Sequence, residues 1–244
     1  MDNPLSFLDL TLQTPEENLA CDEALFLVSE QRGGDGTLRF WMPDRVFVVV
    51  GYTNSVEREV QTEVCRSLGI PILRRFTGGG TVVQMPGCLN FTLVLRIQGR
   101  EEFKTIASTN RFIMDAHRRV LAALLGPAPV TIEGVSDLAL NRMKFCGNAQ
   151  RRGSTALLFH GVFLCSADLQ LISRLLPYPS RSPAYRQHRS HAKFLTNIDI
   201  PPDDLKREIT KAWRAETKAV RPLPEEIQRL ISARYGQKAW NLRR

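Results

Sequence analysis

Four short apolar runs follow one another between residues 130 and 164, with turn-forming and polar residues between them. They occupy residues 130–132, 137–140, 143–146 and 156–164. Segments this short, bounded by turn residues, are typical of strands joined by hairpins. We therefore expect antiparallel pairing to dominate one part of the fold.

Helices are expected on either side of these strands. Residues 14–17 have the form of a capping box with proline at the first helical position, and the helix that they start should end near Gly33-Gly34. A shorter helix is expected at 59–68. Apolar residues also recur at helical spacing within 101–125 and twice within 201–235.

Further strands are expected at 8–12, 37–42, 45–52, 70–75 and 89–97, where β-branched and aromatic residues gather. A turn-forming Pro-Asp pair separates the second of these strands from the third, which predicts a hairpin. Hairpins and helices without strict strand–helix–strand alternation predict an α+β fold, in which a mixed, mainly antiparallel sheet packs against helices.

Chain length and composition favour one domain over residues 1–244, because 43% of the 244 residues are hydrophobic and no repeat or linker marks a boundary. The start does not resemble a signal peptide, and no stretch reaches the roughly 18 apolar residues of a membrane span. We expect a cytoplasmic protein that does not bind membranes. The five cysteines lack paired spacing, which predicts reduced thiols and no metal site.

The formal net charge of +8 favours an anionic partner. An anionic small molecule, an acidic protein and a nucleic acid would all satisfy this charge. The basic residues are dispersed and not interleaved with aromatic ones, so we expect no nucleic-acid binding.

The most unusual local feature is the segment 74–81, in which Arg74 and Arg75 precede three consecutive glycines. The segment joins two expected strands, so it is neither a Walker loop nor a dinucleotide-binding turn, both of which need a following helix. Glycines let backbone amides face one concavity, and the two arginines add forked donors for carboxylate or phosphate. The residues alone fit an anion cradle and an ordinary tight turn equally well.

A second cluster comprises Ser136-Asp137-Leu138, the segment 144–150 and His160-Gly161. By spacing alone, a lysine beside a glycine is usually a solvated turn residue, and a single histidine is usually structural. The cluster gains meaning only together with the glycine-rich segment.

Together the two clusters resemble the catalytic domain of the lipoate-protein ligase and octanoyltransferase superfamily, to which biotin protein ligases also belong. The resemblance covers about residues 7–200, the expected catalytic core, and leaves 201–244 as C-terminal helices. It rests on ordered motifs, which are Asn18-Leu19-Ala20 with Asp22-Glu23, Trp41-x-Pro43, the stretch 48–51, the stretch 74–82, Asp137-Leu138, Lys144-x-x-Gly147-x-Ala149 and His160-Gly161.

The resemblance implies a ligase-type enzyme that attaches lipoate or octanoate to a lysine of an acceptor lipoyl-domain protein. ATP, entering with Mg²⁺, would convert the acid into a mixed anhydride with AMP, whose acyl carbon the acceptor lysine attacks. Lys144 would be the catalytic charge, and Asp137 would orient Lys144 or Mg²⁺. The residues implied at the substrate and the nucleotide are Arg75, Thr77, Gly78, Gly79, Gly80, Thr81, Val82, Asp137, Gly147, Asn148, Ala149 and His160.

Some features of the chain depart from the ligase pattern. Gln84-Met85 stands where ligases often carry His-Asp, and only 47 residues follow Asn197. These features fit a ligase with a separate accessory chain, a minimal ligase, or an enzyme that never uses ATP. In the last case Cys146 is the candidate nucleophile, carrying the acyl group as a thioester.

A non-catalytic acyl- or nucleotide-binding subunit is a further alternative. The expected protein partner of the basic surface is an acidic acceptor lipoyl domain.

Overall fold

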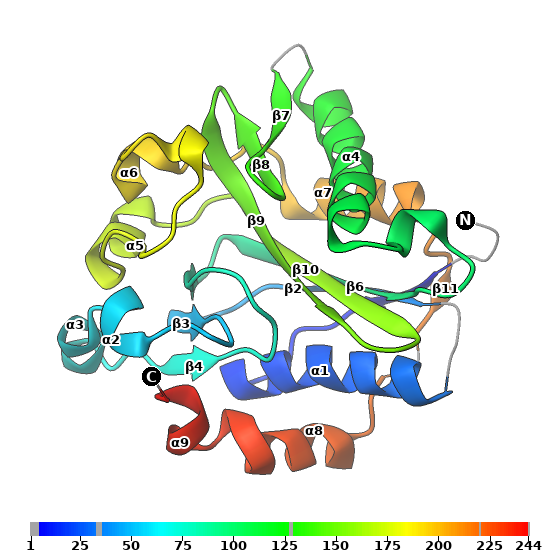
Figure 1. Cartoon of the computed structure of the whole chain (residues 1–244), viewed down its shortest axis with the longest axis horizontal. Helices are drawn as coiled ribbons and strands as arrows, with labels where there is room; N and C mark the ends of the chain where they lie inside the picture. The colour runs from blue at the N-terminus through cyan, green and yellow to red at the C-terminus, as the bar shows by residue number, and fades with distance from the viewer. Residues whose placement is uncertain (1–4, 33–35, 127–128, 220, 244) are drawn as a thin grey trace.

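The computed structural model describes residues 5–32, 36–126, 129–219 and 221–243, which build two sheets with helices around them (Figure 1). The larger sheet has the strand order β11-β1-β2-β6-β10-β9-β8-β7. Neighbours from β2 to β7 pair antiparallel, whereas β1 lies parallel to β2 and β11. The bounds are β1 Ser6–Asp9, β2 Thr37–Trp41, β6 Cys88–Arg96, β7 Val130–Glu133, β8 Asp137–Leu140, β9 Met143–Arg152, β10 Ala156–Leu164 and β11 Thr217–Lys218.

The strands expected between residues 130 and 164 form a continuous antiparallel meander, β7 to β10. Two residues, Asn141 and Arg142, join β8 to β9, and their φ angles are 51° and 61°. Positive φ at both central residues matches the twist of a two-residue hairpin. The predicted α+β fold with a mainly antiparallel sheet is confirmed.

A smaller sheet has the order β4-β3-β5, formed by Ile72–Arg74, Phe47–Val50 and Val82–Gln84. The expected hairpin between 37–42 and 45–52 is wrong, because β2 belongs to the large sheet and β3 pairs with β4 and β5. A turn signal indicates a change of direction, but it does not specify the partner of the next strand. Strand β5 was not anticipated, although the glycine-rich segment does join two strands.

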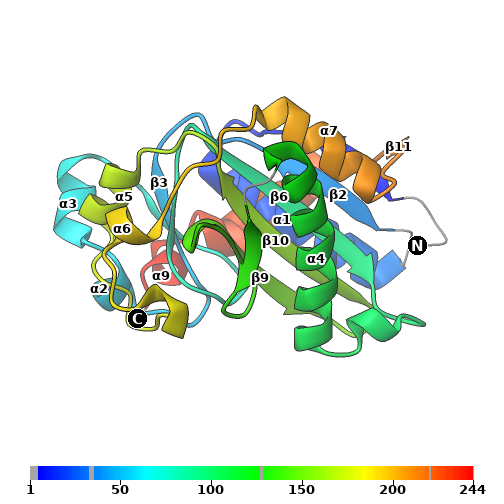
Figure 2. The ribbon, with the colours of Figure 1, turned by 90° about the horizontal axis from the view of Figure 1, so that it is seen from above.

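Helices cover both faces of the large sheet. Helices α4 and α7 bury residues against one face, while α1 and α8 pack on the other (Figure 1 and Figure 2). The capping box at the start of α1 is present, since Thr14 N donates to Glu17 Oε2 at 2.8 Å and Glu17 N donates to Thr14 Oγ1 at 3.2 Å. The bounds are α1 Pro15–Arg32, α4 Ile106–Leu125, α7 Pro202–Ala212 and α8 Pro224–Leu230.

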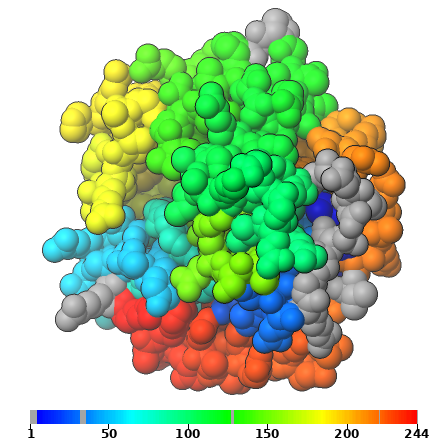
Figure 3. All heavy atoms as spheres, turned by 45° about the vertical axis from the view of Figure 1, so that its right-hand side comes forward, coloured from blue at the N-terminus to red at the C-terminus, as the bar shows by residue number. Residues whose placement is uncertain are grey.

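The shorter helices lie around the small sheet and at the C-terminal end. The single helix expected at 59–68 is two helices, and Gly33-Gly34, the expected end of the first helix, lies outside the described residues. Helix α8 and the residues that follow it, coloured orange-red to red, lie at the lower edge of the molecule beside the blue atoms of α1 (Figure 3). The bounds are α2 Val56–Glu59, α3 Thr62–Ser67, α5 Leu169–Leu175, α6 His191–Phe194 and α9 Lys238–Asn241, with short helical turns at Glu101–Phe103, Ala184–Arg186 and Ile231–Tyr235.

Within the described part of the chain, no helix is both long enough and apolar enough to cross a bilayer.

Candidate active site

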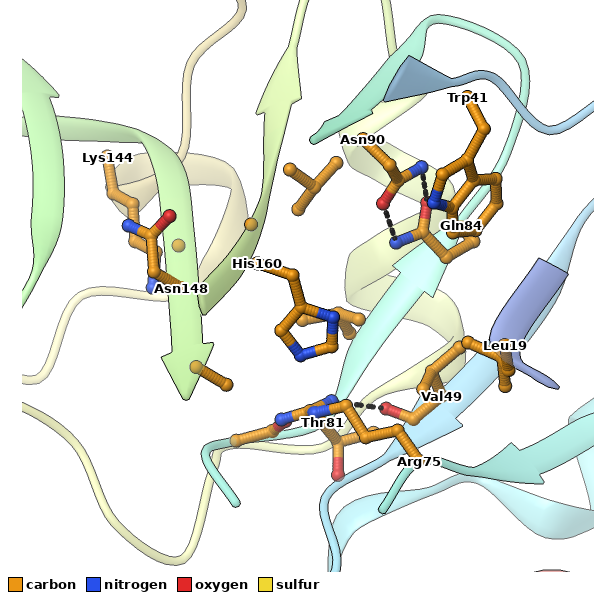
Figure 4. A pocket seen from close by; sticks show the side chains of 16 residues that line it. Leu19, Trp41, Val49, Arg75, Thr81, Gln84, Asn90, Lys144, Asn148 and His160 are labelled. Atoms are coloured by element: carbon orange, nitrogen blue, oxygen red, sulfur yellow. Dashed lines mark hydrogen bonds between the residues drawn. The ribbon is translucent and has the colours of Figure 1, made fainter. Parts of the chain in front are cut away.

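A cleft lies between the small sheet and strands β9 and β10. Residues of α1, β2, β3 and β10 line its inner half (Figure 4), and the segment around α5 and α6 lines its outer half. The two halves adjoin each other, because they share lining residues from the glycine-rich segment and from β9 and β10. The shared residues are Gly80, Thr81, Val82, Lys144, Gly147 and Val162.

Lys144 stands at the junction of the two halves. Its Nζ lies 2.7 Å from Oδ1 of Asp137, and the phenol of Tyr185 donates to Oδ2 of the same carboxylate at 2.8 Å. Burial, together with the adjacent carboxylate, raises the pKa of Tyr185, so the phenol keeps its proton. Each oxygen of Asp137 therefore has a partner, and the carboxylate holds the lysine in one orientation.

The backbone of β9 is adapted to this orientation of Lys144. On β8, Leu138 pairs with Cys146 of β9, and the next residue, Ala139, pairs with Lys144. Phe145 therefore has no partner on β8 and forms a β-bulge in β9. Such a bulge redirects the side chains around it. A Cβ added at Gly147 would lie 2.7 Å from Lys144 Nζ, so the ammonium group can occupy this position only when residue 147 has no Cβ.

Arg75 holds the glycine-rich segment in its curved shape. Its Nε donates to the carbonyl of Gly78 at 3.0 Å, and its Nη2 donates to the carbonyls of Gly78 and Gly80, each at 2.6 Å. Burial lowers the pKa of Arg75 to about 10, which leaves the guanidinium charged at neutral pH. No carboxylate of the described residues pairs with it, so its positive charge acts on the cleft that it lines.

The expectation that both arginines serve this segment is wrong for Arg74. Consecutive residues of a strand point to opposite faces, and Arg74 on β4 points toward the C-terminal helix. Its side chain donates to the carbonyls of Gly51, Asn54 and Trp240, while its backbone N–H donates to Asn241 Oδ1 at 3.0 Å. Arg74 therefore ties β4 to the end of the chain.

Gly51 and Gly79 allow two loops to meet beside the cleft. A Cβ at Gly51 would lie 2.1 Å from the carbonyl oxygen of Gly79, and Gly79 itself has a φ of 85°. Positive φ is unfavourable for residues with a Cβ. These two positions explain part of the glycine content of the region.

His160 connects the glycine-rich segment to α1. Its Nε2 lies 2.8 Å from Thr77 Oγ1, and its Nδ1 lies 3.7 Å from Oδ2 of Asp22. Burial on its own would raise the pKa of Asp22, but the Arg39 guanidinium, 2.6 Å from Oδ1, holds this pKa below its ordinary value. Burial lowers the pKa of His160, so the imidazole is neutral at physiological pH.

Polar groups also line the inner half of the cleft. Gln84 and Asn90 exchange two amide hydrogen bonds of 2.7 and 2.9 Å (Figure 4). The indole nitrogen of Trp41 and the hydroxyl of Thr81 are buried without a hydrogen-bond partner among the described residues. Unsatisfied buried groups of this kind are suited to receiving a ligand.

The outer half of the cleft combines apolar walls with basic side chains. Its lining includes Phe194 and Leu176, together with Arg181, Arg186 and His191. No acidic residue occurs among the described residues that line this half. A ligand with an apolar ring and a negative charge would fit both features.

Cys146 lies two residues from Lys144 in sequence and borders the outer half of the cleft, but it packs into the core. It is only 1% exposed, and burial raises the pKa of its thiol despite the nearby lysine. Its Sγ lies 3.6 Å from Asn148 Oδ1. A thiol held in this way has little thiolate character at neutral pH.

The structure brings most of the sequence-predicted residues together around the cleft. Those that line it are Arg75, Gly80, Thr81, Val82, Lys144, Gly147, Asn148, Ala149 and His160, with Cys146 at the outer half. Thr77, Gly78, Gly79 and Asp137 do not line it and contact residues that do.

Sequence reasoning missed several residues of the cleft and of the contacts behind it. Tyr185, which bonds to Asp137, and Arg186, which lines the outer half, lie outside all the motifs on which the resemblance rests. Trp41 and Asp22 stand in motifs to which the resemblance assigns no role, and Gln84 is a departure from the ligase pattern. Conversely, no group of three or more His, Cys, Asp or Glu side chains suited to a metal ion occurs among the described residues.

The chain is similar in sequence to known proteins over most of its length. Residues 14–213 match the model of the lipoyl protein ligase A/B catalytic domain. The chain is 26% identical to lipoate-protein ligase A subunit 1 of Thermoplasma acidophilum, covering 96% of this chain and 95% of the relative. It is 27% identical to the octanoyltransferase LipM of Carboxydothermus hydrogenoformans, covering 84% and 80%.

The chain is also similar in fold to solved structures of lipoate-protein ligases. A bi-partite lipoate protein ligase from Thermoplasma acidophilum, studied with its E2 lipoyl domain, superposes with a TM-score of 0.82 at 25% identity, covering 99% of this chain and 98% of that one. A lipoate-protein ligase A bound with ATP superposes with a TM-score of 0.77 at 26% identity, covering 98% and 99%.

Proposed function

The chain belongs to the lipoyl protein ligase A/B catalytic-domain family, and from this premise we propose that it attaches lipoate or octanoate to a lysine of an acceptor lipoyl domain. Membership makes it an enzyme of the ligase or acyltransferase type. The acyl group would be activated by ATP as an acyl-adenylate.

The observation that carries this proposal is that the inner and outer halves of the cleft meet at Lys144, which lines both. The inner half, between Leu19, Trp41 and Val49, suits a medium-length acyl chain, and the outer half suits an adenine ring with phosphates. A ligand that fills both halves has its carboxyl carbon and α-phosphate near Lys144. In adenylation the new bond forms at this place, between a carboxylate oxygen of the acid and the α-phosphorus.

The chemistry has two steps. The carboxylate of the acid attacks the α-phosphorus of ATP and pyrophosphate leaves; the acceptor amine then attacks the acyl carbon, AMP leaves and the amine loses a proton. Lys144, fixed by Asp137, would stabilise the negative charge that grows on the acyl and phosphate oxygens. Arg75 would add its charge from the opposite wall, with the backbone amides of Gly80 and Thr81.

The other predicted residues would act by shape or position. Ala149, Asn148 and His160 would form the wall beside the acyl chain, with Val82 and Gly147 at the junction. Thr77 would act through His160. Mg²⁺ would enter as part of the ATP complex, with its ligands drawn from phosphate and water, because each oxygen of Asp137 already has a partner.

An ATP-independent octanoyltransferase with Cys146 as nucleophile is the second candidate, favoured by relatives named octanoyltransferase. The burial of Cys146 favours the ligase instead, because a thioester intermediate needs a thiol that deprotonates and meets its substrate.

The bi-partite relative supports a partner chain for this enzyme as well. We propose that residues 7–200 form the catalytic core, that 201–244 add helices to it, and that a separate accessory chain takes part in the reaction. The acceptor would be an acidic lipoyl domain.

One experiment tests the function directly. The purified protein is incubated with an apo lipoyl domain and either lipoate, ATP and Mg²⁺ or octanoyl-carrier protein without ATP, and the acceptor is weighed by mass spectrometry. We expect a lipoyl mass that requires ATP. An octanoyl mass gained without ATP would establish the transferase, and no modification in either arm, with and without the accessory chain of a relative, would refute both.

Lys144→Ala tests the assigned catalytic charge. We expect the rate of acyl transfer to fall by roughly 10² to 10³, because one preorganised charge at the transition state is lost. The exposed Lys193→Ala is the matched control and should leave the rate unchanged. Unfolding temperatures of both variants should equal that of the wild type, and a Lys144→Ala rate within tenfold of wild type would remove Lys144 from its assigned role.

A further inference from the structure

Arg186 is an unexplained buried cation at the outer half of the cleft. It is only 4% exposed, lines the cleft, and one of its terminal nitrogens, Nη2, has no hydrogen-bond partner among the described residues. Its Nε donates to the carbonyl of Arg189 at 2.9 Å. A buried guanidinium with an unused donor is costly unless a ligand supplies the acceptor.

The surroundings hold this guanidinium rigidly. Its central carbon lies 4.7 Å from the ring centroids of both Tyr178 and Phe194, so two aromatic rings fix its plane. Arg189, which donates to the carbonyls of Arg186, Tyr185 and Arg142, braces the same turn. The donor is therefore preorganised before any ligand arrives.

The charges that face this position are positive. Lys144, Arg181 and Arg186 line the outer half, and no carboxylate among the described residues does. His191 also lines it, and burial, with the charges of Arg186 and Lys144, lowers its pKa to about 4, so it is a neutral hydrogen-bonding group at physiological pH. Asp137, the carboxylate paired with Lys144, offsets one charge of the three.

Arg181 and Arg186 add positive charge to the outer half, away from Lys144 at the junction. In the proposed function the acyl carbon and the α-phosphate meet at Lys144, so only the nucleotide itself and its outer phosphates reach the outer half. Guanidinium groups bind phosphate oxygens with two parallel hydrogen bonds, which a planar, fixed fork favours.

We propose that Arg186 binds the β- and γ-phosphates of the nucleotide, with Arg181 and His191 completing the site, and that it positions pyrophosphate as the leaving group of the adenylation step. This inference rests on the proposed function. The proposal gives the two residues different roles. Lys144 acts in both adenylation and transfer to the acceptor, whereas Arg186 acts only in adenylation.

The two half-reactions can be measured apart. Arg186→Met keeps the apolar stem between the two rings and removes the charge, and Arg186→Lys restores a charge without the fork. Arg174→Met, on the exposed face of α5, is the matched control. The first readout is lipoate-dependent exchange of pyrophosphate into ATP, and the second is transfer to an apo lipoyl domain from synthetic lipoyl-AMP, which has no β- or γ-phosphate.

We expect Arg186→Met to raise the KM for ATP and lower the exchange rate by about 10- to 100-fold in kcat/KM, the range for a lost charge-assisted contact. Arg186→Lys should recover part of this loss. Transfer from lipoyl-AMP should stay within about twofold, since the missing phosphates leave Arg186 without a partner in that step. Unchanged exchange, or equal losses in both half-reactions, would overturn the assignment.

A binding measurement with phosphate compounds tests the Arg186 site even if the wild type does not use ATP. Inorganic pyrophosphate and tripolyphosphate are titrated into wild type, Arg186→Met and Arg174→Met by calorimetry. Weaker binding in Arg186→Met alone supports the site, and equal binding in all three refutes it. Exchange by the wild type, which only an adenylating enzyme shows, reports separately on the proposed function.

Discussion

Lys144 and Cys146 lie two residues apart on β9, yet their surroundings give them opposite chemistry. Lys144 pairs with Asp137 at the junction of the cleft, whereas Cys146, although it borders the outer half, is almost fully buried in the core and burial raises the pKa of its thiol. The bulge at Phe145 separates the two side chains. Proximity in sequence to a positive charge is therefore a poor guide to thiol reactivity here.

Cys146→Ser discriminates between the two leading mechanisms. Serine keeps a similar size and hydrogen-bonding capacity, so an adenylating enzyme should retain most of its activity and its requirement for ATP. If the acyl group passes through sulfur, turnover should instead fall by orders of magnitude. Steady-state rates with and without ATP check this, and an octanoyl mass on wild-type Cys146 without ATP would contradict our expectation.

Strand β9 contributes a steric requirement as well as a lysine. A Cβ at Gly147 would occupy the space of Lys144 Nζ, so Gly147→Ala should push the ammonium out of position and lower the rate by about 10²-fold. The control is the double variant with Lys144→Ala, which should be no slower than Lys144→Ala alone. Additive losses would show that Gly147 acts by some other route, such as a change in the strand.

The contact between α4 and the end of α7 makes stability depend on pH. His117 on α4 is fully buried, and its Nε2 accepts a hydrogen bond of 2.9 Å from the indole of Trp213. Burial lowers the pKa of His117 from 6.5 to about 3. Between these values the unfolded chain binds more protons than the folded one, so stability falls as pH drops below 6.5.

His117→Gln should therefore flatten this dependence, because glutamine can accept the indole hydrogen bond and does not titrate. Between pH 7 and 4.5 the wild type should lose roughly 2.5 kcal/mol through this residue. Urea unfolding at pH 7 and 4.5 measures the difference. The slope should shrink without vanishing, since His160 and His191 also have lowered pKa values, and an unchanged slope would show that His117 is not the main proton acceptor.

The net charge of the whole molecule should affect the rate at which it associates with its acceptor. A net charge of +8 should steer an acidic lipoyl domain toward the enzyme and raise mainly the association rate. The second-order rate constant for the acceptor should fall as salt rises from low to physiological ionic strength. The rate with a small uncharged amine as acceptor provides the control, and equal salt dependence for both acceptors would assign the basic surface another purpose.

The sequence by itself determined the features that depend on neighbouring residues. The meander over residues 130–164, the capped start of α1 and the strand-to-strand glycine-rich segment all follow from local spacing and turn chemistry, and the ordered motifs indicated the family. Arg75, Lys144 and His160 could be named as candidates for the same reason, since each stands in one of those motifs.

Tertiary structure decided which segments meet. Whether β3 pairs with β2 or with β4 and β5 depends on contacts between distant parts of the chain. Such contacts cannot be inferred from the residues next to β3. The same holds for Arg74, which turns to the C-terminal helix, and for Tyr185 and Arg186, brought to the cleft from over 40 residues beyond Asp137. Burial, which sets the chemistry of Cys146, His117 and Arg186, exists only once those distant segments have packed together.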